Sequence, residues 1–357
     1  MRELVSAPLA PLTSLRLGGV ADTLIEAATE GELVESVLGA PAGEAPFVLG
    51  GGSNIVVADS GVRGRVVRVM TQGVIVKERN DRDVLLEVQA GESWDKLVER
   101  CVHEGWAGLE SMSGIPGLVG ATPIQNVGAY GYEVGPFVEQ VKVLDRPTSA
   151  ISVLAGERCA FSYRDSMFKR RPDRYVVLSV TLRLSRAAES SVRYEELARA
   201  LNVDAHAVAP LSTIRQTVIA LRRNKGMVLD DGDHDTRSAG SFFTNAIVSI
   251  EMFASLVARA RLLGVEEPAH FAHGDRVKVA AAWLIEKSGF SKGYRRDGVG
   301  ISTKHSLALV NDGGTTEALL SLASDIVKKV NDVWGLSLER EPVLVGDFHS
   351  TSLGSRL

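Results

Sequence analysis

Short apolar runs, typical of buried strands, alternate along the chain with stripes of apolar residues at helical spacing. The runs predict strands at 24–27, 47–49, 55–57, 64–70, 73–78, 84–90, 138–144, 175–184 and 343–345. Thr29 and Glu32 form a capping box before a helical stripe at 33–38. Further helices are predicted from Ser93 to near Gly105 and at 210–225, 249–263, 277–288 and 315–334. This mixture predicts an α+β or α/β protein.

Two glycine-rich segments interrupt this pattern. The chain has 35 glycines in 357 residues, above the ordinary ~7%. The first cluster, Gly50-Gly51-Gly52-Ser53-Asn54, joins two predicted strands, while the stretch 108–134 has little periodicity and no charge between Glu110 and Glu133. A loop of that length in a compact domain is usually a binding loop. Consecutive glycines let backbone N–H groups converge on an anion, so we expect the two segments to hold a dinucleotide. A tight turn is the alternative for the first segment alone.

Charge and cysteine usage narrow the class of protein. The 44 acidic and 40 basic residues give a net charge of −4, which argues against bulk binding of nucleic acid or anionic lipid. Cys101 and Cys159 cannot form a disulfide framework, which favours the reducing cytoplasm. No apolar run reaches the ~18 residues of a membrane span, and the N-terminus lacks a signal-peptide pattern. We therefore expect a cytoplasmic protein with no membrane or nucleic-acid partner.

Three short motifs carry candidate chemistry. Arg164 presents a guanidinium fork that suits a carboxylate, although a surface ion pair is the simpler interpretation of that motif alone. Ser241 lies between Gly240 and two aromatic residues, where a packed turn is the alternative, and no hydrolase motif surrounds it. Glu341 precedes Pro342 and is therefore held extended, so it can project into a cleft or sit at a surface.

Two polar clusters are not expected to bind metal. The acidic run 230–235 lacks the spacing of a calcium loop, so we interpret it as a solvated loop. His270 and His273 have no acidic neighbours in a ligand pattern. We predict no metal site.

Taken in order, these motifs resemble the UDP-N-acetylenolpyruvoylglucosamine reductase family, the flavoenzymes of bacterial peptidoglycan synthesis. The matching residues lie at 12–19, 49–54, 113–117, 121–131, 161–166, 240–245 and 341–343. The resemblance implies an α+β fold of the vanillyl-alcohol-oxidase type (PCMH-type), with two FAD-binding subdomains and a third α+β substrate domain. By analogy, subdomain 1 is 1–75 with the C-terminal tail 335–357, subdomain 2 is 76–227, and the substrate domain is 228–334.

The resemblance also implies a reaction: NADPH-dependent reduction of the enolpyruvyl group of UDP-N-acetylglucosamine-enolpyruvate to the lactyl ether of UDP-N-acetylmuramate, an oxidoreductase reaction at a CH–CH bond. The cofactor would be non-covalent FAD and the protein a monomer. Arg164, Ser241 and Glu341 are the implied catalytic residues. Ser241 would protonate C2, with Arg164 at the carboxylate, and Glu341 would either donate a proton or orient a water.

The implied binding residues fall into two sets. The residues expected to bind the cofactor are Gly50, Gly51, Gly52, Ser53, Asn54, Ser113, Gly114, Ile115, Gly117, Gly120, Ala121, Gln125, Asn126, Gly128, Ala129 and Tyr130. The residues expected to bind the substrate are Tyr163, Tyr194, Lys225, Asn245 and His305. Tyr194, in the segment 192–197, resembles the Tyr-bearing insertion that one type of this family has. Lys225 would contact the diphosphate or, alternatively, assist proton transfer beside Ser241.

This sequence departs from the family pattern at two positions. The catalytic Glu is often followed by Val and then Arg, whereas Pro342 and Val343 follow Glu341 here. A flavin contact by that Arg would therefore be missing. His305 stands where some members carry Gln, and both side chains can hydrogen-bond.

Two other functions remain open. An oxidase of the same flavin fold, acting on a sugar or alcohol, would often tether FAD through a His, and neither glycine-rich segment contains one. A flavin-bearing sensor without turnover would not need Arg164, Ser241 and Glu341 together. Bleaching of the yellow colour by NADPH, followed by recolouring with the enolpyruvyl sugar, would distinguish the reductase from both.

Overall fold

The computed structural model describes residues 1–41, 43–78 and 80–348, so residues 349–357 of the predicted C-terminal tail lie outside it. The chain forms two compact units. Unit 1 comprises Met1–Ala7, Ala21–Gly51 and Gly64–Asn224, and unit 2 comprises Pro8–Val20, Gly52–Arg63 and Lys225–Leu357. The expected three-domain division stays a prediction.

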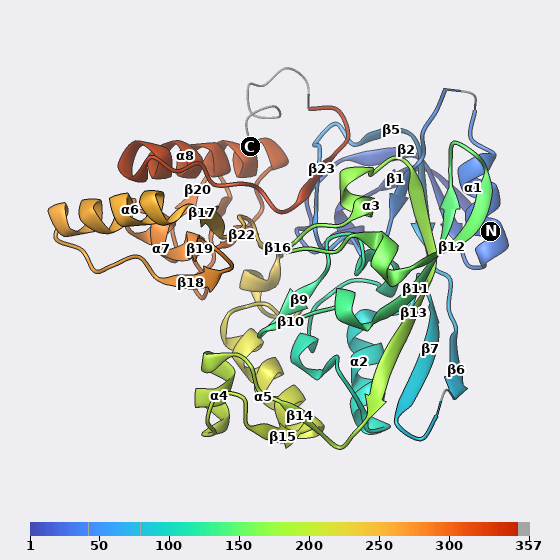
Figure 1. Cartoon of the computed structure of the whole chain (residues 1–357). Helices are drawn as coiled ribbons and strands as arrows, with labels where there is room; N and C mark the ends of the chain where they lie inside the picture. The colour runs from blue at the N-terminus through green and yellow to red at the C-terminus, as the bar shows by residue number, and fades with distance from the viewer. Residues whose placement is uncertain (42, 79, 349–357) are drawn as a thin grey trace. The chain divides into compact units, whose positions relative to one another are not determined.

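The larger sheet of unit 1 is antiparallel, with strand order β12-β11-β13-β7-β6 and β8 paired to β13. Its long strands β11, β13 and β7 run side by side in Figure 1. Val84, Leu86 and Val88 alternate along β7 and are buried against Trp94 of α2, as the period-2 pattern requires. The elements are β6 (Val74–Glu78), β7 (Asp83–Gln89), α2 (Trp94–His103), β8 (Trp106–Ala107), β11 (Val138–Asp145), β12 (Ala150–Ala155) and β13 (Tyr175–Arg186).

A second, four-stranded sheet has the order β1-β2-β5-β3. Its elements are β1 (Arg2–Pro8), β2 (Val20–Ala27), β3 (Phe47–Leu49) and β5 (Val62–Val69), with the helix α1 (Glu30–Leu38). The predicted capping box is confirmed, because the Glu32 N–H donates to Thr29 Oγ1 at 3.2 Å and the Thr29 N–H donates to Glu32 Oε2 at 3.3 Å. Leu33 of α1 packs against Val67 of β5.

The rest of unit 1 consists of short elements around the long glycine-rich stretch. That stretch contains 3₁₀ helices at Glu110–Met112 and Val119–Ala121, joined by turns. Leu197 of α4 and Ile214 of α5 pack with Tyr130, which lies at its far end. The elements are β9 (Gly128–Ala129), β10 (Tyr132–Glu133), α3 (Met167–Arg170), β14 (Glu189–Ser191), α4 (Glu195–Leu201), β15 (Val208–Pro210) and α5 (Leu211–Asn224).

Unit 2 contains two small antiparallel sheets and a parallel pair. The strand orders are β16-β22-β21-β20 and β17-β19-β18, and β23 pairs with β4 in parallel. The elements are β4 (Ile55–Val57), β16 (Ser238–Ser241), β17 (Ala246–Val248), α6 (Ile250–Leu262), β18 (His270–His273), β19 (Arg276–Val279), α7 (Ala281–Glu286), β20 (Arg295–Arg296), β21 (Val299–Ile301), β22 (Ala308–Asn311), α8 (Thr316–Trp334) and β23 (Val343–Val345).

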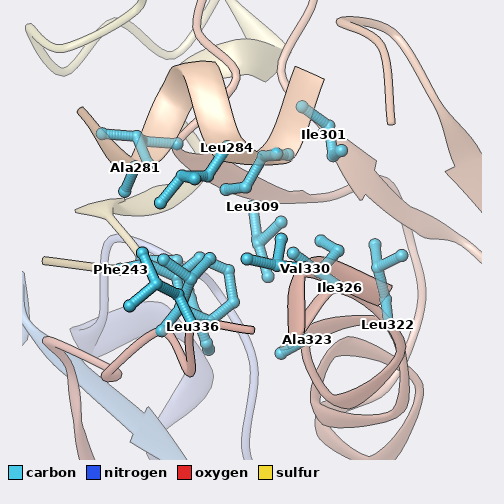
Figure 2. Close-up of a cluster of buried hydrophobic side chains, with 14 of the residues drawn as sticks. Phe243, Ala281, Leu284, Ile301, Leu309, Leu322, Ala323, Ile326, Val330 and Leu336 are labelled. Atoms are coloured by element: carbon cyan, nitrogen blue, oxygen red, sulfur yellow. The ribbon is translucent and has the colours of Figure 1, made fainter. Parts of the chain in front are cut away.

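One apolar core holds unit 2 together. Figure 2 shows Leu322, Ile326 and Val330 of α8 converging with Leu309 of β22 and Leu284 of α7. The rings of Trp283 and Trp334 pack 4.7 Å apart and join α7 to α8. The predicted helix 315–334 is confirmed, whereas the predicted helix 277–288 is wrong at its start. Val277 and Val279 lie in β19, which pairs with β17, and α7 begins only at Ala281.

A buried and an exposed leucine of unit 2 provide a matched test of this core. Leu322→Ala should lower the free energy of unfolding by about 2–5 kcal/mol, because Leu322 is 0% exposed and its removal leaves a cavity. Leu262 of α6 is 89% exposed, so Leu262→Ala should change it by less than about 0.5 kcal/mol. Urea denaturation measures both values, and equal shifts would contradict the assigned core.

Candidate active site

The two predicted cofactor segments meet within unit 1 at their glycines. A Cβ built on Gly51 would lie 2.7 Å from the Gly117 Cα, and one on Gly50 would lie 3.9 Å from the Ala121 Cβ. A Cβ on Gly120 would lie 2.5 Å from the Ala90 Cβ. The distance at Gly50 is an ordinary contact, whereas those at Gly51 and Gly120 leave no room for a Cβ, so the fold needs glycine at these two positions. Gly52, Ser53 and Asn54, the other residues of the first segment, belong to unit 2.

An ion pair between the half-buried Asp95 and the buried Arg215 holds the start of the second segment. The Gly114 N–H donates to Asp95 Oδ1 at 2.6 Å. Arg215 of α5, which is 9% exposed, donates from Nη1 to Asp95 Oδ1 at 2.7 Å and from Nη2 to Oδ2 at 3.1 Å. Burial alone would raise the pKa of the Asp95 carboxyl, but the hydrogen bonds from Arg215 and Gly114 lower it below its ordinary 3.8. The carboxylate therefore stays charged and keeps its geometry.

The turn that carries Arg164 is tied to the same glycine-rich stretch. Arg164 Nη2 donates to the Gly128 carbonyl at 3.0 Å, and Asn126 Nδ2 donates to the Ser162 carbonyl at 3.0 Å. Ser166 Oγ donates to the Ile124 carbonyl. Arg164 has a left-handed backbone, with φ of 53°, which turns the chain sharply at this point. The neighbouring Asp165 forms an ion pair with Arg170.

Aromatic residues and a buried cation lie at the far end of the stretch. The Tyr130 and Tyr194 rings meet edge to face at 5.6 Å, and the Arg164 guanidinium lies 5.5 Å from the Tyr163 ring. Burial raises the pKa of Tyr130 to about 12 and also raises the pKa of Tyr194, so both phenols are neutral at physiological pH. Burial lowers the pKa of Arg222, in α5, to about 10, although the nearby Tyr130 opposes the shift.

The remaining predicted cofactor residues lie on this same stretch. Ser113 is buried and donates from Oγ to the Glu110 carbonyl at 2.6 Å. Gly128 and Ala129 form β9, and Ile115 packs against the core of the larger sheet. Gln125 precedes Asn126, whose Oδ1 accepts a hydrogen bond from the Gly135 N–H at 2.8 Å.

Unit 2 brings Ser241 and Glu341 together through Phe242. The Phe242 N–H donates to the Leu307 carbonyl at 2.7 Å, and the Glu341 N–H donates to the Phe242 carbonyl at 2.9 Å. Ser241 pairs with Ala308 in the sheet. The Phe242 and Phe243 rings are fully buried, 5.3 Å apart, and Figure 2 shows Phe243 within the core. The buried rings therefore fix the backbone on which both candidate catalytic side chains are carried.

His305 lies on the turn that leads into Ala308. The His305 N–H donates to Ser302 Oγ at 3.2 Å, and the Ala308 N–H donates to the His305 carbonyl at 3.1 Å. Because Leu307 is bonded to Phe242, this turn lies next to the Ser241 strand. Three predicted site residues of unit 2, Ser241, His305 and Glu341, are thus carried by adjacent backbone segments.

The acidic run 230–235 is not simply a solvated loop, and that expectation is wrong for two of its residues. Asp235 is 6% exposed and accepts hydrogen bonds from the Thr303 N–H, at 2.9 Å, and from Thr303 Oγ1. Lys304 Nζ donates to Asp233 Oδ2 at 2.5 Å, which raises the pKa of Lys304. Asp231 remains exposed, paired with Arg16. Within 1–41, 43–78 and 80–348, no group of His, Cys, Asp and Glu could hold a metal ion.

Lys225 and Asn245, two residues expected to bind the substrate, both belong to unit 2. Lys225 immediately precedes Gly226, which has a left-handed φ of 66°. Asn245 Oδ1 accepts a hydrogen bond from the Ala281 N–H at 3.0 Å, so this side chain also caps the start of α7. The substrate role of both residues stays a prediction.

The sequence did not predict four residues that the structure places at or next to the candidate site residues: Asp95, Arg215, Arg222 and Arg340. Arg340 precedes Glu341 and lies opposite Phe243 in an isolated bridge. Its Nε and Nη1 atoms are buried and make no hydrogen bond within the part of the chain that the structure describes, and burial lowers its pKa. No local pattern distinguishes these residues from ordinary helix or strand positions, because each depends on a contact distant in sequence.

The two joined glycine segments, largely uncharged and closely packed, fit the class of proteins that bind a flavin dinucleotide. Residues 21–153 match the family model of an FAD binding domain. Residues 232–345 match that of the UDP-N-acetylenolpyruvoylglucosamine reductase C-terminal domain. No helix in the described ranges is long and apolar enough to cross a membrane.

Whole-chain relatives carry the same assignment. A UDP-N-acetylenolpyruvoylglucosamine reductase of Thermobifida fusca is 50% identical over 96% of this chain and 97% of the relative. The UDP-N-acetylenolpyruvoylglucosamine reductase of Mycobacterium tuberculosis is 39% identical over 96% of this chain and 95% of the relative. The chain belongs to the UDP-N-acetylenolpyruvoylglucosamine reductase family. The crystal structure of the reductase from Thermus caldophilus shares the fold, with a TM-score of 0.65 and 24% identity. The match covers 96% of this chain and 98% of that chain. The expected α+β, FAD-binding fold is confirmed.

The Asp95 ion pair predicts a measurable effect on cofactor retention. Asp95→Ala removes the acceptor of the Gly114 N–H and leaves Arg215 without its partner, so FAD should dissociate about 10-fold more readily. Recovery of free FAD fluorescence during dilution measures this. Glu99→Gln is the control, because Glu99 is a largely exposed neighbour 3.5 Å from Arg215.

The same ion pair sets a pH limit. The pKa of Asp95 is lower in the folded protein than its ordinary value of 3.8. The stabilisation by the charged carboxylate is therefore complete above pH 3.8, and it is lost only as the pH falls through the pKa of the folded state. Wild-type FAD retention should not lose this contribution between pH 5 and 8. A loss in that range that Asp95→Ala abolishes would contradict the assignment.

Proposed function

We propose that this chain catalyses the NADPH-dependent reduction of UDP-N-acetylglucosamine-enolpyruvate to UDP-N-acetylmuramate. The observation that carries the proposal is the set of hydrogen bonds between the Arg164 turn and the glycine-rich stretch. These bonds fix a carboxylate-binding group on the loop predicted to bind FAD. Such a combination suits a flavoenzyme whose substrate bears a carboxylate beside the reacting carbon. The whole-chain relatives of that name support the same reaction.

FAD, when bound, supplies the hydride that it has received from NADPH. After a hydride reaches C3 of the enolpyruvyl group, negative charge builds on the substrate carboxylate. Arg164 would stabilise that negative charge, because a guanidinium stays protonated and can donate two parallel hydrogen bonds. Its left-handed backbone and its bond to the Gly128 carbonyl restrict where the guanidinium can lie. This pre-organisation reduces the reorganisation that the reaction requires.

Ser241 is the proposed donor of the proton that C2 needs. A serine hydroxyl is a weak acid, so the transfer needs positive charge nearby, and Lys225 is one candidate. Glu341, one residue beyond Arg340, either donates as a neutral carboxylic acid or orients a water. Its backbone bond to Phe242 keeps it beside the Ser241 strand in either case.

The nucleotide part of the substrate would be held by Tyr163, Tyr194, Lys225, Asn245 and His305. A phenol is neutral at physiological pH, and burial raises the pKa of Tyr194 further, so this side chain can donate a hydrogen bond to a phosphate oxygen without charge repulsion. Lys225 supplies a point charge for the diphosphate. We further propose that the protein acts as a cytoplasmic monomer. Its two cysteines, both buried and unpaired, are consistent with a reducing compartment.

An anaerobic two-step assay tests this function. The purified protein should be yellow, should bleach with NADPH, and should regain its colour when the enolpyruvyl sugar is added, with UDP-N-acetylmuramate as product. Bleaching without recolouring would contradict the reductase proposal. Reduction by a free sugar or alcohol, followed by reoxidation with dioxygen, would indicate an oxidase instead.

Ser241→Ala should separate the two steps. Bleaching by NADPH should keep its wild-type rate, because flavin reduction needs no proton at substrate C2. Turnover should fall by about 10²–10⁴, the usual contribution of a general acid. Stopped-flow absorbance measures both steps on one sample. Equal losses in the two steps would assign Ser241 to folding or to cofactor binding.

Lys225→Ala distinguishes the two roles open to that residue. A contact with the diphosphate is equally strong in the ground and transition states, so its loss should raise KM for the UDP-sugar and leave kcat nearly unchanged. Steady-state kinetics at several NADPH concentrations measures both constants. A large fall in kcat at constant KM would instead assign Lys225 to proton transfer beside Ser241.

A further inference from the structure

The acidic loop 230–235 contains a buried carboxylate that the reaction itself does not use. Asp235 is 6% exposed, although aspartate is rarely buried without a partner. Its partner is the turn 302–307 of unit 2, which carries His305. The backbone of the loop is itself closed by a hydrogen bond from the Asp235 N–H to Asp233 Oδ1 at 3.1 Å. The carboxylate is therefore presented to the turn by a fixed backbone.

Asp235 makes two hydrogen bonds to one residue of that turn. The Thr303 N–H donates to Asp235 Oδ1 at 2.9 Å, and Thr303 Oγ1 donates to Asp235 Oδ2. Arg295 Nη2 lies 3.8 Å from Oδ1 and adds positive charge. Burial would raise the pKa of Asp235, but the Thr303 hydrogen bonds lower it, so the acceptor remains an anion. Charge-assisted bonds of this kind are stronger than neutral ones.

Further hydrogen bonds within the turn 302–307 connect Thr303 to His305. Ser302 Oγ accepts from the Lys304 N–H at 3.0 Å and from the His305 N–H at 3.2 Å. The strands on either side are fixed in the core, where Figure 2 shows Ile301 and Leu309. The base of the turn is thus held by apolar packing, while its tip is held by the acidic loop. Thr303 is only two residues from His305.

Asp235 also lies against the segment that begins with Lys225. A Cβ built on Gly226 would lie 3.1 Å from the Asp235 Cβ and 3.3 Å from its carbonyl oxygen. Gly226 has a φ of 66°, a conformation that glycine adopts without strain. One buried residue therefore contacts two segments, each of which carries a residue proposed to bind the substrate.

We propose that Asp235 is a positioning residue for nucleotide binding, which holds the His305 turn in the geometry that contacts the UDP diphosphate. The inference rests on the proposed function in one respect, the contact between His305 and the nucleotide. In this role Asp235 does not contact the substrate, and it acts through Thr303 and the rest of the turn 302–307. The acidic loop that follows α5 thereby takes part in substrate recognition.

A double-mutant cycle on the FAD-loaded enzyme tests this role, with UDP as the probe and calorimetry as the measurement. His305→Ala and Asp235→Ala should each weaken UDP binding about 10-fold, the loss of roughly one hydrogen bond. The double variant should bind no more than about 2-fold more weakly than His305→Ala alone, because both changes remove one contact. Asp235→Asn keeps an acceptor for the Thr303 N–H and should restore most of the affinity.

Asp231→Asn is the matched control, because Asp231 belongs to the same loop, its side chain is 93% exposed, and its carboxylate pairs with Arg16. It should bind UDP as the wild type does. Additive losses in the cycle would show that Asp235 affects UDP binding independently of His305 and would overturn the proposal. Unchanged UDP binding in His305→Ala would overturn it as well.

The outcome can be separated from a failure of the proposed reaction. UDP binding does not require turnover, so the cycle remains interpretable if the enolpyruvyl sugar fails to recolour the reduced enzyme. Conversely, normal turnover of the wild type with an additive cycle would leave the reductase function intact and remove only the role of Asp235.

Discussion

The backbone of Phe242 is the constraint on which the geometry of unit 2 depends. Its N–H and carbonyl are bonded to Leu307 and Glu341, so one residue joins three segments that are far apart in sequence. The buried rings of Phe242 and Phe243 prevent this backbone from rotating, since rotation would expose both rings. The backbone of Ser241, the proposed proton donor, is therefore held in place although Ser241 itself is only partly buried. Polar chemistry in this unit is thus positioned by apolar packing.

Unit 1 achieves the same precision by a different means. There the close approach of Gly51 and Gly117 brings two loops into backbone contact, and hydrogen bonds to carbonyl groups then fix the Arg164 turn. Leu109, Met112 and Val119 of the second segment are buried in the core of the larger sheet. The ion pair of Asp95 with Arg215, together with the Gly114 N–H bond to Asp95, also joins this segment to two helices. Loop geometry therefore depends on helix positions that the local sequence does not reveal.

The sequence predicted elements whose causes are local, and it failed where tertiary contacts decide. The capping box at Thr29 and the apolar stripe of α8 are local, and both were predicted correctly. Val277 and Val279 were assigned to a helix, but pairing with β17 holds them extended. The glycine segments and Arg164, Ser241 and Glu341 stood out by composition and resemblance. Asp235 was read as solvated because its partner, Thr303, is remote along the chain.

Three residues with left-handed backbones limit how this chain can be stabilised by substitution. Asn126, Tyr130 and Arg164 have φ values of 48°, 48° and 53°, a conformation that costs non-glycine residues about 1–2 kcal/mol. Glycine would relieve that strain at each position, but it would also remove the hydrogen bonds of Asn126 and Arg164 and the buried ring of Tyr130. A search for stabilising glycine substitutions would therefore fail at these positions, although their backbone angles favour glycine. The strain persists because the contacts of the three side chains over-determine the backbone.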